Sequence, residues 1–214
     1  MSIAALSNFT VPLASDQSAV TQGMLMPKLK YRFRINFENM GITVADNVEL
    51  TKQVQDCARP TVGFTNQVIE IYNSKINYAG KPAWEALSVK LRDDVTGFVT
   101  KLVGEQNQRQ FDFFEQSSAA SAGDYKFTMR IEMLDGSNGS VYQGDSNSSL
   151  ETWELYGCYL EKTVYSTLDY KEQGPVVIEL TVRFDNAVQT KGGTLGSKSA
   201  VMNNNTTSNN VMGS

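Results

Sequence analysis

At 214 residues with 41% hydrophobic side chains, the chain is long enough to bury the core of one globular domain. It contains no histidine, which removes the commonest general base and the commonest metal ligand, and this argues against most hydrolases and zinc sites. The net charge of -4 argues against a dedicated nucleic-acid-binding protein.

The two cysteines, Cys57 and Cys158, lie far apart in the sequence, which favours reduced thiols over a disulfide framework. The first residues carry neither the basic start nor the apolar stretch of a secretory signal. No segment approaches the roughly 18 consecutive apolar residues of a membrane helix, so we expect no membrane segment.

The chain begins with a predicted arm, residues 1–26, which is rich in Ser, Ala, Thr and Gln and includes the apolar residues Phe9, Val11 and Leu13. Residues 28–37 then alternate between apolar and basic side chains, and this period of two predicts a half-buried strand. Its apolar face consists of Leu29, Tyr31, Phe33, Ile35 and Phe37, and its basic row of Lys28, Lys30, Arg32 and Arg34.

Residues 57–93 are rich in β-forming side chains and hold no set of residues suited to catalysis. The elements predicted in and just before this segment are a weaker strand at 48–57, β-rich runs at 69–72 and 75–78, a Gly-Pro breaker at 79–82 and a strand at 84–92. Helical spacing follows once, where Val95, Phe98, Val99 and Leu102 recur at i, i+3, i+4 and i+7 behind two aspartates.

The remaining elements are, in chain order, a Ser/Ala/Gly cluster at 117–123, a strand at 125–133, a polar loop at 135–149, strands at 151–160 and 176–185, and a polar tail. This pattern predicts a mainly β fold, a small antiparallel β-barrel or sandwich with one flanking α-helix. We expect three regions: an N-terminal arm at 1–26, a β domain at 27–185 and a low-complexity C-terminal tail at 186–214.

Candidate chemistry is sparse. Asp135, Asn138 and Asp145 offer oxygens for calcium, but their spacing matches no EF-hand and suits ordinary turns. The carboxylates that could form an acid/base pair are scattered, as surface acids commonly are: Glu151, Glu154, Glu161, Asp169 and Glu172. We therefore expect a protein that is not an enzyme, with no catalytic residue, no metal and no cofactor.

The basic row is the sharpest candidate for a nucleic-acid surface, because its four cations could lie against phosphates. Strict alternation sends the neighbouring aromatic side chains to the opposite face of the strand, so bases could not stack where phosphates bind. We favour a solvated or subunit-pairing face.

Six segments carry a family resemblance through their order and spacing: CARPTVGF, IEIYNSKINYAG, the strand that begins at Trp84, WELYGCYL, STLDY and VVIELTVRFD. Together they resemble the major tail tube proteins of contractile-tailed phages, and more narrowly those of T4-like myoviruses. The resemblance spans residues 29–185. The tail after Asp185 and the length of the arm depart from the family pattern.

The resemblance implies a tail-tube or type VI secretion tube-like fold, a small β-barrel flanked by a helix, with six copies in a ring. Rings would stack into the inner tail tube of the virion, and phage DNA would pass through the lumen to the host without specific binding. The implied partners are further copies, the tail sheath protein, the baseplate tube initiator and the tail terminator, with assembly in the bacterial host cytoplasm. Strands of neighbouring copies would join into one lumen-lining barrel, which would close the sheet edges.

The resemblance also motivates two expectations about residues. Apolar residues in irregular segments are predicted to stack one ring on the next, and to be exposed in an isolated subunit: Phe64, Val68, Ile71 and Tyr72, with Phe9, Val11 and Leu13 of the arm. The alternative is that they fill the subunit's own core. Because a cationic lumen would retain DNA through counterion release, Lys28, Lys30, Arg32 and Arg34 are predicted to face outward or to pair with acids.

Two other functions stay open. The first is a tube initiator or terminator of the same tail. The second is a carbohydrate-binding β-sandwich module, which would present a flat row of exposed aromatic side chains, whereas most aromatic residues here alternate inward.

Overall fold

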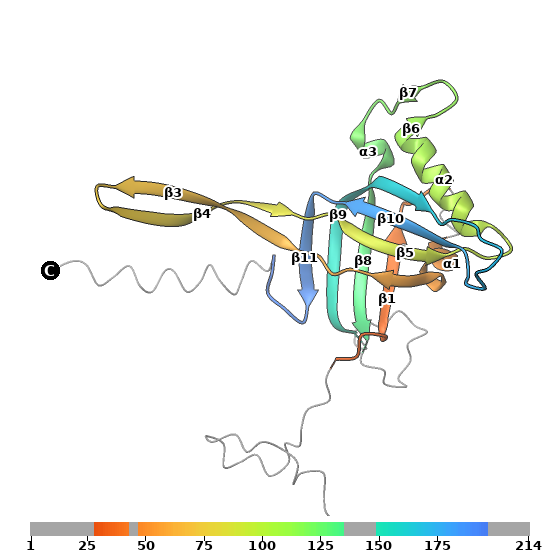
Figure 1. Ribbon diagram of the computed structural model, residues 1–214, viewed down its shortest axis with the longest axis horizontal. Coiled ribbons are helices and arrows are strands. Elements are labelled where there is room, and N and C mark those ends of the chain that lie inside the picture. The colour runs from red at the N-terminus through yellow and green to blue at the C-terminus, as the bar shows by residue number, and fades with distance from the viewer. Residues whose placement is uncertain (1–27, 43–46, 135–148, 197–214) are drawn as a thin grey trace, which may run out of the picture.

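The computed structural model describes residues 28–42, 47–134 and 149–196, and these form an antiparallel β body with one long projecting hairpin (Figure 1). The elements are β1 (Phe33–Glu38), α1 (Asn47–Lys52), β2 (Val54–Cys57), β3 (Val62–Ile71), β4 (Ser74–Trp84), β5 (Leu87–Arg92), α2 (Phe98–Gln110), β6 (Phe111–Asp112), β7 (Ser117–Ser118), α3 (Ala122–Tyr125), β8 (Phe127–Leu134), β9 (Ser149–Tyr165), β10 (Val177–Arg183) and β11 (Asn186–Lys191). The mainly β, antiparallel fold with a flanking helix is thereby confirmed. The predicted arm and most of the predicted 135–149 loop lie outside the described residues.

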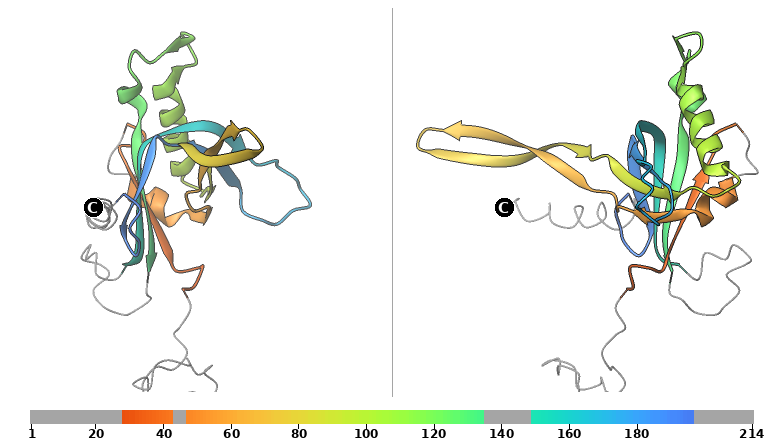
Figure 2. Two further views of the ribbon diagram at one scale, coloured as in Figure 1. Left: turned by 90° about the vertical axis from the view of Figure 1, so that its left-hand side faces the viewer. Right: turned by 45° about the vertical axis from the view of Figure 1, so that its right-hand side comes forward.

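One bent sheet forms the body. Its strands follow the order β1-β8-β9-β10-β5-β2, and β11 also pairs with β9. The first part of β9 lies between β8 and β11, and the last part pairs with β10, so β10 and β11 follow one another along one edge of β9 (Figure 2). The bend lies at Gly157, which has a φ of 68°. A Cβ atom at this position would collide with the Asp185 carboxylate. Only glycine adopts this conformation cheaply, so Gly157 permits the sheet to fold over its core.

The core lies between the two parts of this sheet and α2. It uses the alternating face of each strand, as a period of two requires, and the apolar face of the helix. Its buried side chains include Ile35, Phe37, Leu87, Val89, Leu91, Val99, Leu102, Val103, Phe127, Met129, Leu155, Ile178, Leu180 and Val182. The buried amide of Gln106 is satisfied, because it accepts from the Gly41 amide at 3.0 Å and donates to the Tyr125 carbonyl at 2.6 Å.

Two predicted strands and one predicted breaker differ from the structure. The strand predicted at 28–37 begins only at Phe33, because the Arg32 amide donates to the Leu29 carbonyl and closes a turn. The strand predicted at 48–57 is replaced by α1 and the short β2, since one helical turn suffices to bring Leu50 into the core. The breaker predicted at 79–82 does not end a strand: β4 continues through it with a bulge, in which Gly80 and Lys81 lie opposite the single residue Thr65 and Pro82 lies opposite Phe64.

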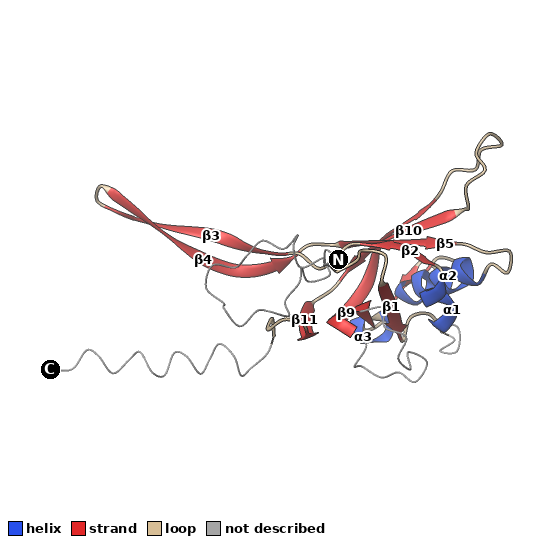
Figure 3. Ribbon diagram, turned by 90° about the horizontal axis from the view of Figure 1, so that it is seen from below, coloured by secondary structure: helices blue, strands red, loops and turns tan. Residues whose placement is uncertain are grey.

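Two further differences concern the ends of elements. The helix begins at Phe98, so Val95 lies before it and is fully exposed. The sheet also continues past residue 185, where we predicted the tail to start: β11 pairs with β9 and buries Ala187. Seen from below, α1 and α2 lie at the end of the body opposite the hairpin (Figure 3).

Candidate functional site

The projecting hairpin, β3 and β4, exposes more large apolar side chains than any other element among the described residues. Its strands pair with each other over their whole length and with no other described strand (Figures 1 and 3). The large apolar side chains that it exposes are Phe64, Val68, Ile69, Ile71, Tyr72, Ile76 and Tyr78. An isolated two-stranded hairpin is only marginally stable in water, and an apolar patch of this kind marks an interaction surface.

The hairpin is held in shape by local contacts. At its tip, Tyr72 adopts a positive φ of 45° and is 99% exposed. Lys75 pairs with Glu70 across the strands at 2.6 Å. Near the root of the hairpin, a Cβ atom at Gly80 would lie only 2.8 Å from the Thr65 carbonyl oxygen. This close approach explains the glycine within the strand.

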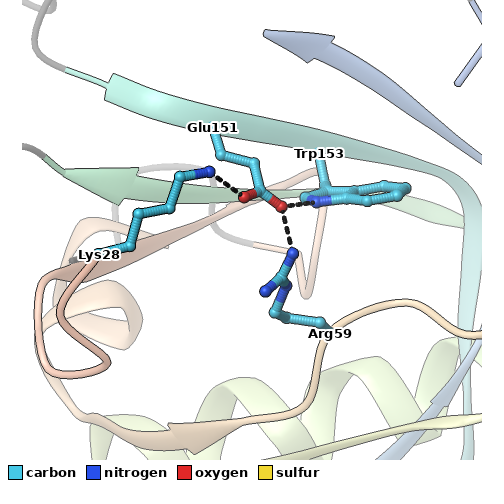
Figure 4. Close-up of polar contacts among 4 residues, drawn as sticks. All are labelled: Lys28, Arg59, Glu151 and Trp153. Atoms are coloured by element: carbon cyan, nitrogen blue, oxygen red, sulfur yellow. Dashed lines mark hydrogen bonds and ion pairs between the residues drawn. The ribbon is translucent and has the colours of Figure 1, made fainter. Parts of the chain in front are cut away.

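A buried carboxylate, Glu151 of β9, fixes the root of the hairpin (Figure 4). Its side chain is 3% exposed and accepts hydrogen bonds from Arg59 Nη2 at 2.7 Å, Lys28 Nζ at 2.8 Å and Trp153 Nε1 at 2.6 Å. Arg59 lies three residues before β3, and Lys28 is the first described residue after the predicted arm. We call these four residues the Glu151 anchor.

The electrostatics of the anchor favour an ionised Glu151. Burial acts to raise the pKa of its carboxyl group, but the hydrogen bonds from Lys28 and Trp153 and the positive charges of Arg59 and Lys28 outweigh it. The pKa of Glu151 therefore lies below its ordinary value. An ionised, buried carboxylate that is fully hydrogen-bonded holds its partners in a defined geometry.

The sequence reasoning missed this role, because it treated Glu151 as one of several scattered surface acids. The available signal was the spacing of Glu151 and Trp153, which a strand places on one face. Two other acids of that set also lie in ion pairs: Glu154 with Arg130 at 3.1 Å, and Glu161 with Arg183 at 3.1 Å.

The structure places the predicted site residues as follows. Phe64, Val68, Ile71 and Tyr72 lie on the exposed hairpin and not in the subunit core, whereas Phe9, Val11 and Leu13 lie outside the described residues. In the basic row, Lys28 pairs with Glu151, Arg34 pairs with Glu132 at 2.5 Å, Lys30 is exposed, and Arg32 lies 5.6 Å from the ring centre of Tyr31. Their orientation relative to a channel stays a prediction.

Other kinds of site find no support among residues 28–42, 47–134 and 149–196. These residues contain no group of three or more Cys, Asp or Glu side chains arranged to hold a metal ion. None of their helices combines the length and the apolar character needed to span a membrane. The aspartates considered for calcium fall in the undescribed 135–148 segment.

No protein-family model and no curated protein matches the chain. Solved structures match its fold. A chain in the anti-feeding prophage baseplate structure is 13% identical with a TM-score of 0.54, and the match covers 79% of this chain and 99% of that chain. A chain in the sheath-tube complex of an extracellular contractile injection system is 12% identical with a TM-score of 0.54, covering 84% and 99%.

A third match is a chain in the tube-terminating cap of the anti-feeding prophage, which is 9% identical with a TM-score of 0.55, covering 82% of this chain and 98% of that chain. At these identities the likeness concerns the fold alone. The chain therefore shares its fold with proteins found in a baseplate, a sheath-tube complex and a tube cap.

Proposed function

We propose that the protein is a structural subunit of the inner tube of a contractile phage tail, in which rings of six copies stack into a hollow tube that delivers DNA to the host. The observation that carries the proposal is the exposed apolar hairpin on a fold shared with a sheath-tube complex chain. The role is structural and not enzymatic. Its place is the virion tail, assembled in the host cytoplasm as in T4-like phages, with the sheath, initiator and terminator as further partners.

The hairpin supports stacking of one ring on the next. Two paired strands that bury little of their own apolar surface gain stability when another surface covers them. Phe64, Val68, Ile71 and Tyr72 are all at least 47% exposed, so a neighbouring copy can bury a large apolar area there.

The sheet edges support association within a ring. Among the described strands, β1 pairs only with β8, and β2 only with β5. Each therefore presents one free edge of backbone donors and acceptors. Edge strands of neighbouring copies can satisfy one another and close a barrel.

One face of the sheet suits a channel wall that lets DNA slide. On the side of β1, β8 and β9 away from the core, Arg34 pairs with Glu132, and Arg130 pairs with Glu154 and, at 3.9 Å, with Glu38. Three glutamates thus neutralise two arginines and leave an excess of negative charge. Such a face releases no counterions from DNA and so does not hold it.

A tube terminator or initiator is a second candidate, because the fold is equally similar to that of the tube-terminating cap chain. Such proteins occur in few copies per particle, whereas a tube subunit occurs in many. Counting copies per virion by quantitative mass spectrometry separates the two.

Negative-stain electron microscopy of the purified protein tests the proposal. We expect rings or hollow tubes from the native chain, and rings or subunits without long tubes from Ile71→Glu, because a buried charge at the stacking surface is costly. Phe114→Glu is the matched control: it places the same charge on an equally apolar, 94% exposed residue outside the hairpin, and tubes should persist. Native protein that stays monomeric and binds sugars would overturn the proposal in favour of a carbohydrate-binding module.

A further inference from the structure

The loop that joins β9 to β10, residues 166–176, lies at the end of the molecule opposite the hairpin (Figures 1 and 3). Its residues line a hollow. The hollow has a volume of about 560 Å³, and Leu168, Tyr170, Pro175 and Val176 contribute to its lining. Leu168 is 80% exposed and Tyr170 fully exposed, so the loop leaves apolar surface uncovered. The Asp93 amide donates to the Val176 carbonyl at 3.0 Å and ties the loop to the segment before α2.

This end of the molecule carries an excess of acidic side chains. Asp169 and Glu172 outnumber Lys171 in the loop, and Asp93 and Asp94 lie in the adjoining segment. Hydrogen bonds, first that from the Thr96 hydroxyl, hold the pKa of Asp94 below its usual value, which keeps that carboxylate ionised.

The charges near the tip of the hairpin cancel, because Lys75 pairs with Glu70. Lys81 lies near the root, about 25 Å of extended strand from the tip. The tip therefore offers an apolar surface and not a charged one.

The two features lie at opposite ends of the longest axis (Figure 1). When two unlike surfaces at opposite ends of a molecule bind each other, the same contact repeats from copy to copy and the assembly can grow without limit. A tube requires this property. The tip of the hairpin carries an aromatic side chain, Tyr72, which is 99% exposed. A hollow of this size accepts an aromatic side chain.

We propose that the hollow formed by residues 166–176 receives the tip of the β3–β4 hairpin from a second copy of the chain. Tyr72 and Ile71 of one copy cover Leu168 and Tyr170 of the next. The proposal rests on the stacking role of the hairpin under the proposed function, and it adds the surface that receives the hairpin.

Crosslinking between two introduced cysteines tests this contact directly. The double variant Tyr72→Cys/Tyr170→Cys, treated with a short bismaleimide after assembly, should give a ladder of covalent multimers on a denaturing gel. Each single variant should give none. All crosslinking variants are made in a Cys57→Ser background, because the native Cys57 is half-buried, whereas Cys158 is buried and burial raises its pKa to about 12.

The matched control is Tyr72→Cys/Phe114→Cys, which offers an equally exposed aromatic position on the β6–β7 loop. A ladder from the control pair and none from the Tyr72/Tyr170 pair would overturn the proposal, since it would place the hairpin on the β6–β7 loop.

Charge variants separate this inference from the proposed function. Ile71→Glu and Leu168→Glu should each abolish long tubes, and an equimolar mixture should form short stacks, because one intact hairpin still meets one intact hollow. If Ile71→Glu abolishes tubes but Leu168→Glu does not, and no Tyr72/Tyr170 ladder forms, the hollow is not the acceptor and hairpin stacking stands. If both variants form long tubes at normal yield, both proposals fail.

Discussion

Arg59 donates a hydrogen bond from its guanidinium to Glu151 at 2.7 Å and so joins the segment before the hairpin to the central strand β9. The other carboxylate oxygen accepts from Lys28 at 2.8 Å, at the point where the predicted arm meets the body. One buried carboxylate thus fixes the roots of both segments that we expect to reach neighbouring copies. Removing the Glu151 carboxylate should disturb both the hairpin and the arm while the core stays folded.

Replacing Glu151 by glutamine should lower the free energy of unfolding by about 2 kcal/mol near neutral pH, because hydrogen bonds to a buried charged group are lost. The pKa of the native carboxyl group is depressed, so its contribution is present above the ordinary value of 4.5 and is lost as the pH falls through the lower folded-state pKa. Urea unfolding across this acid range should therefore show a steeper loss for the native chain than for Glu151→Gln. Glu115→Gln, at an exposed acid, should follow the native curve; identical slopes for all three chains would contradict the prediction.

Arg59→Ala should loosen the hairpin without unfolding the body. Glu151 keeps Lys28 and Trp153 as donors, so we expect a loss of only about 1 kcal/mol in global stability. Amide hydrogen exchange should accelerate in β3 and β4, and fewer long tubes should form. The control is Lys101→Ala, which removes an ion pair with Glu105 on α2, at the end of the body opposite the hairpin. Unchanged hairpin exchange in Arg59→Ala would show that the anchor does not position it.

Sequence periodicity predicted the body of the fold, because strands that bury one face must alternate. The runs that became β1, β5, β8 and β10 each placed their apolar face in the core. The α1 turn was missed for the same reason: among the α1 side chains that the structure describes, only Leu50 is buried, and one buried residue creates no period. Strand β11 was missed because a polar edge strand looks like the polar tail that follows it.

The candidate site was predictable in part. The exposed apolar side chains of the hairpin could be named in advance, although the segment that carries them is a regular hairpin and not irregular as predicted. The Glu151 anchor could not, since its partners Lys28 and Arg59 lie 123 and 92 residues away in the chain. Contacts over such separations depend on how the strands are ordered, and alternation within one strand carries no information on that order.

Two glycines should respond to alanine in opposite directions. Gly157→Ala should cost about 2 kcal/mol, because a positive φ is unfavourable for alanine and the new methyl group meets the Asp185 carboxylate. Gly104→Ala, inside α2 with open space around it, should gain about 0.5–1 kcal/mol from helix propensity. Thermal unfolding of both variants measures this. Equal changes would mean that the bend at Gly157 does not require glycine.

The acid excess on the outer face of β1, β8 and β9 should decide whether assembled tubes hold DNA. In Glu38→Lys/Glu154→Lys, Arg130 loses both of its partners and two further cations are added, so the face becomes strongly basic. Co-sedimentation of a short duplex with tubes should then rise steeply at low salt and vanish at high salt, whereas native tubes should retain little DNA at either. Glu161→Lys places a cation on the other part of the sheet and serves as the control. If it retains as much DNA as the double variant, the face of β1, β8 and β9 is not the channel wall.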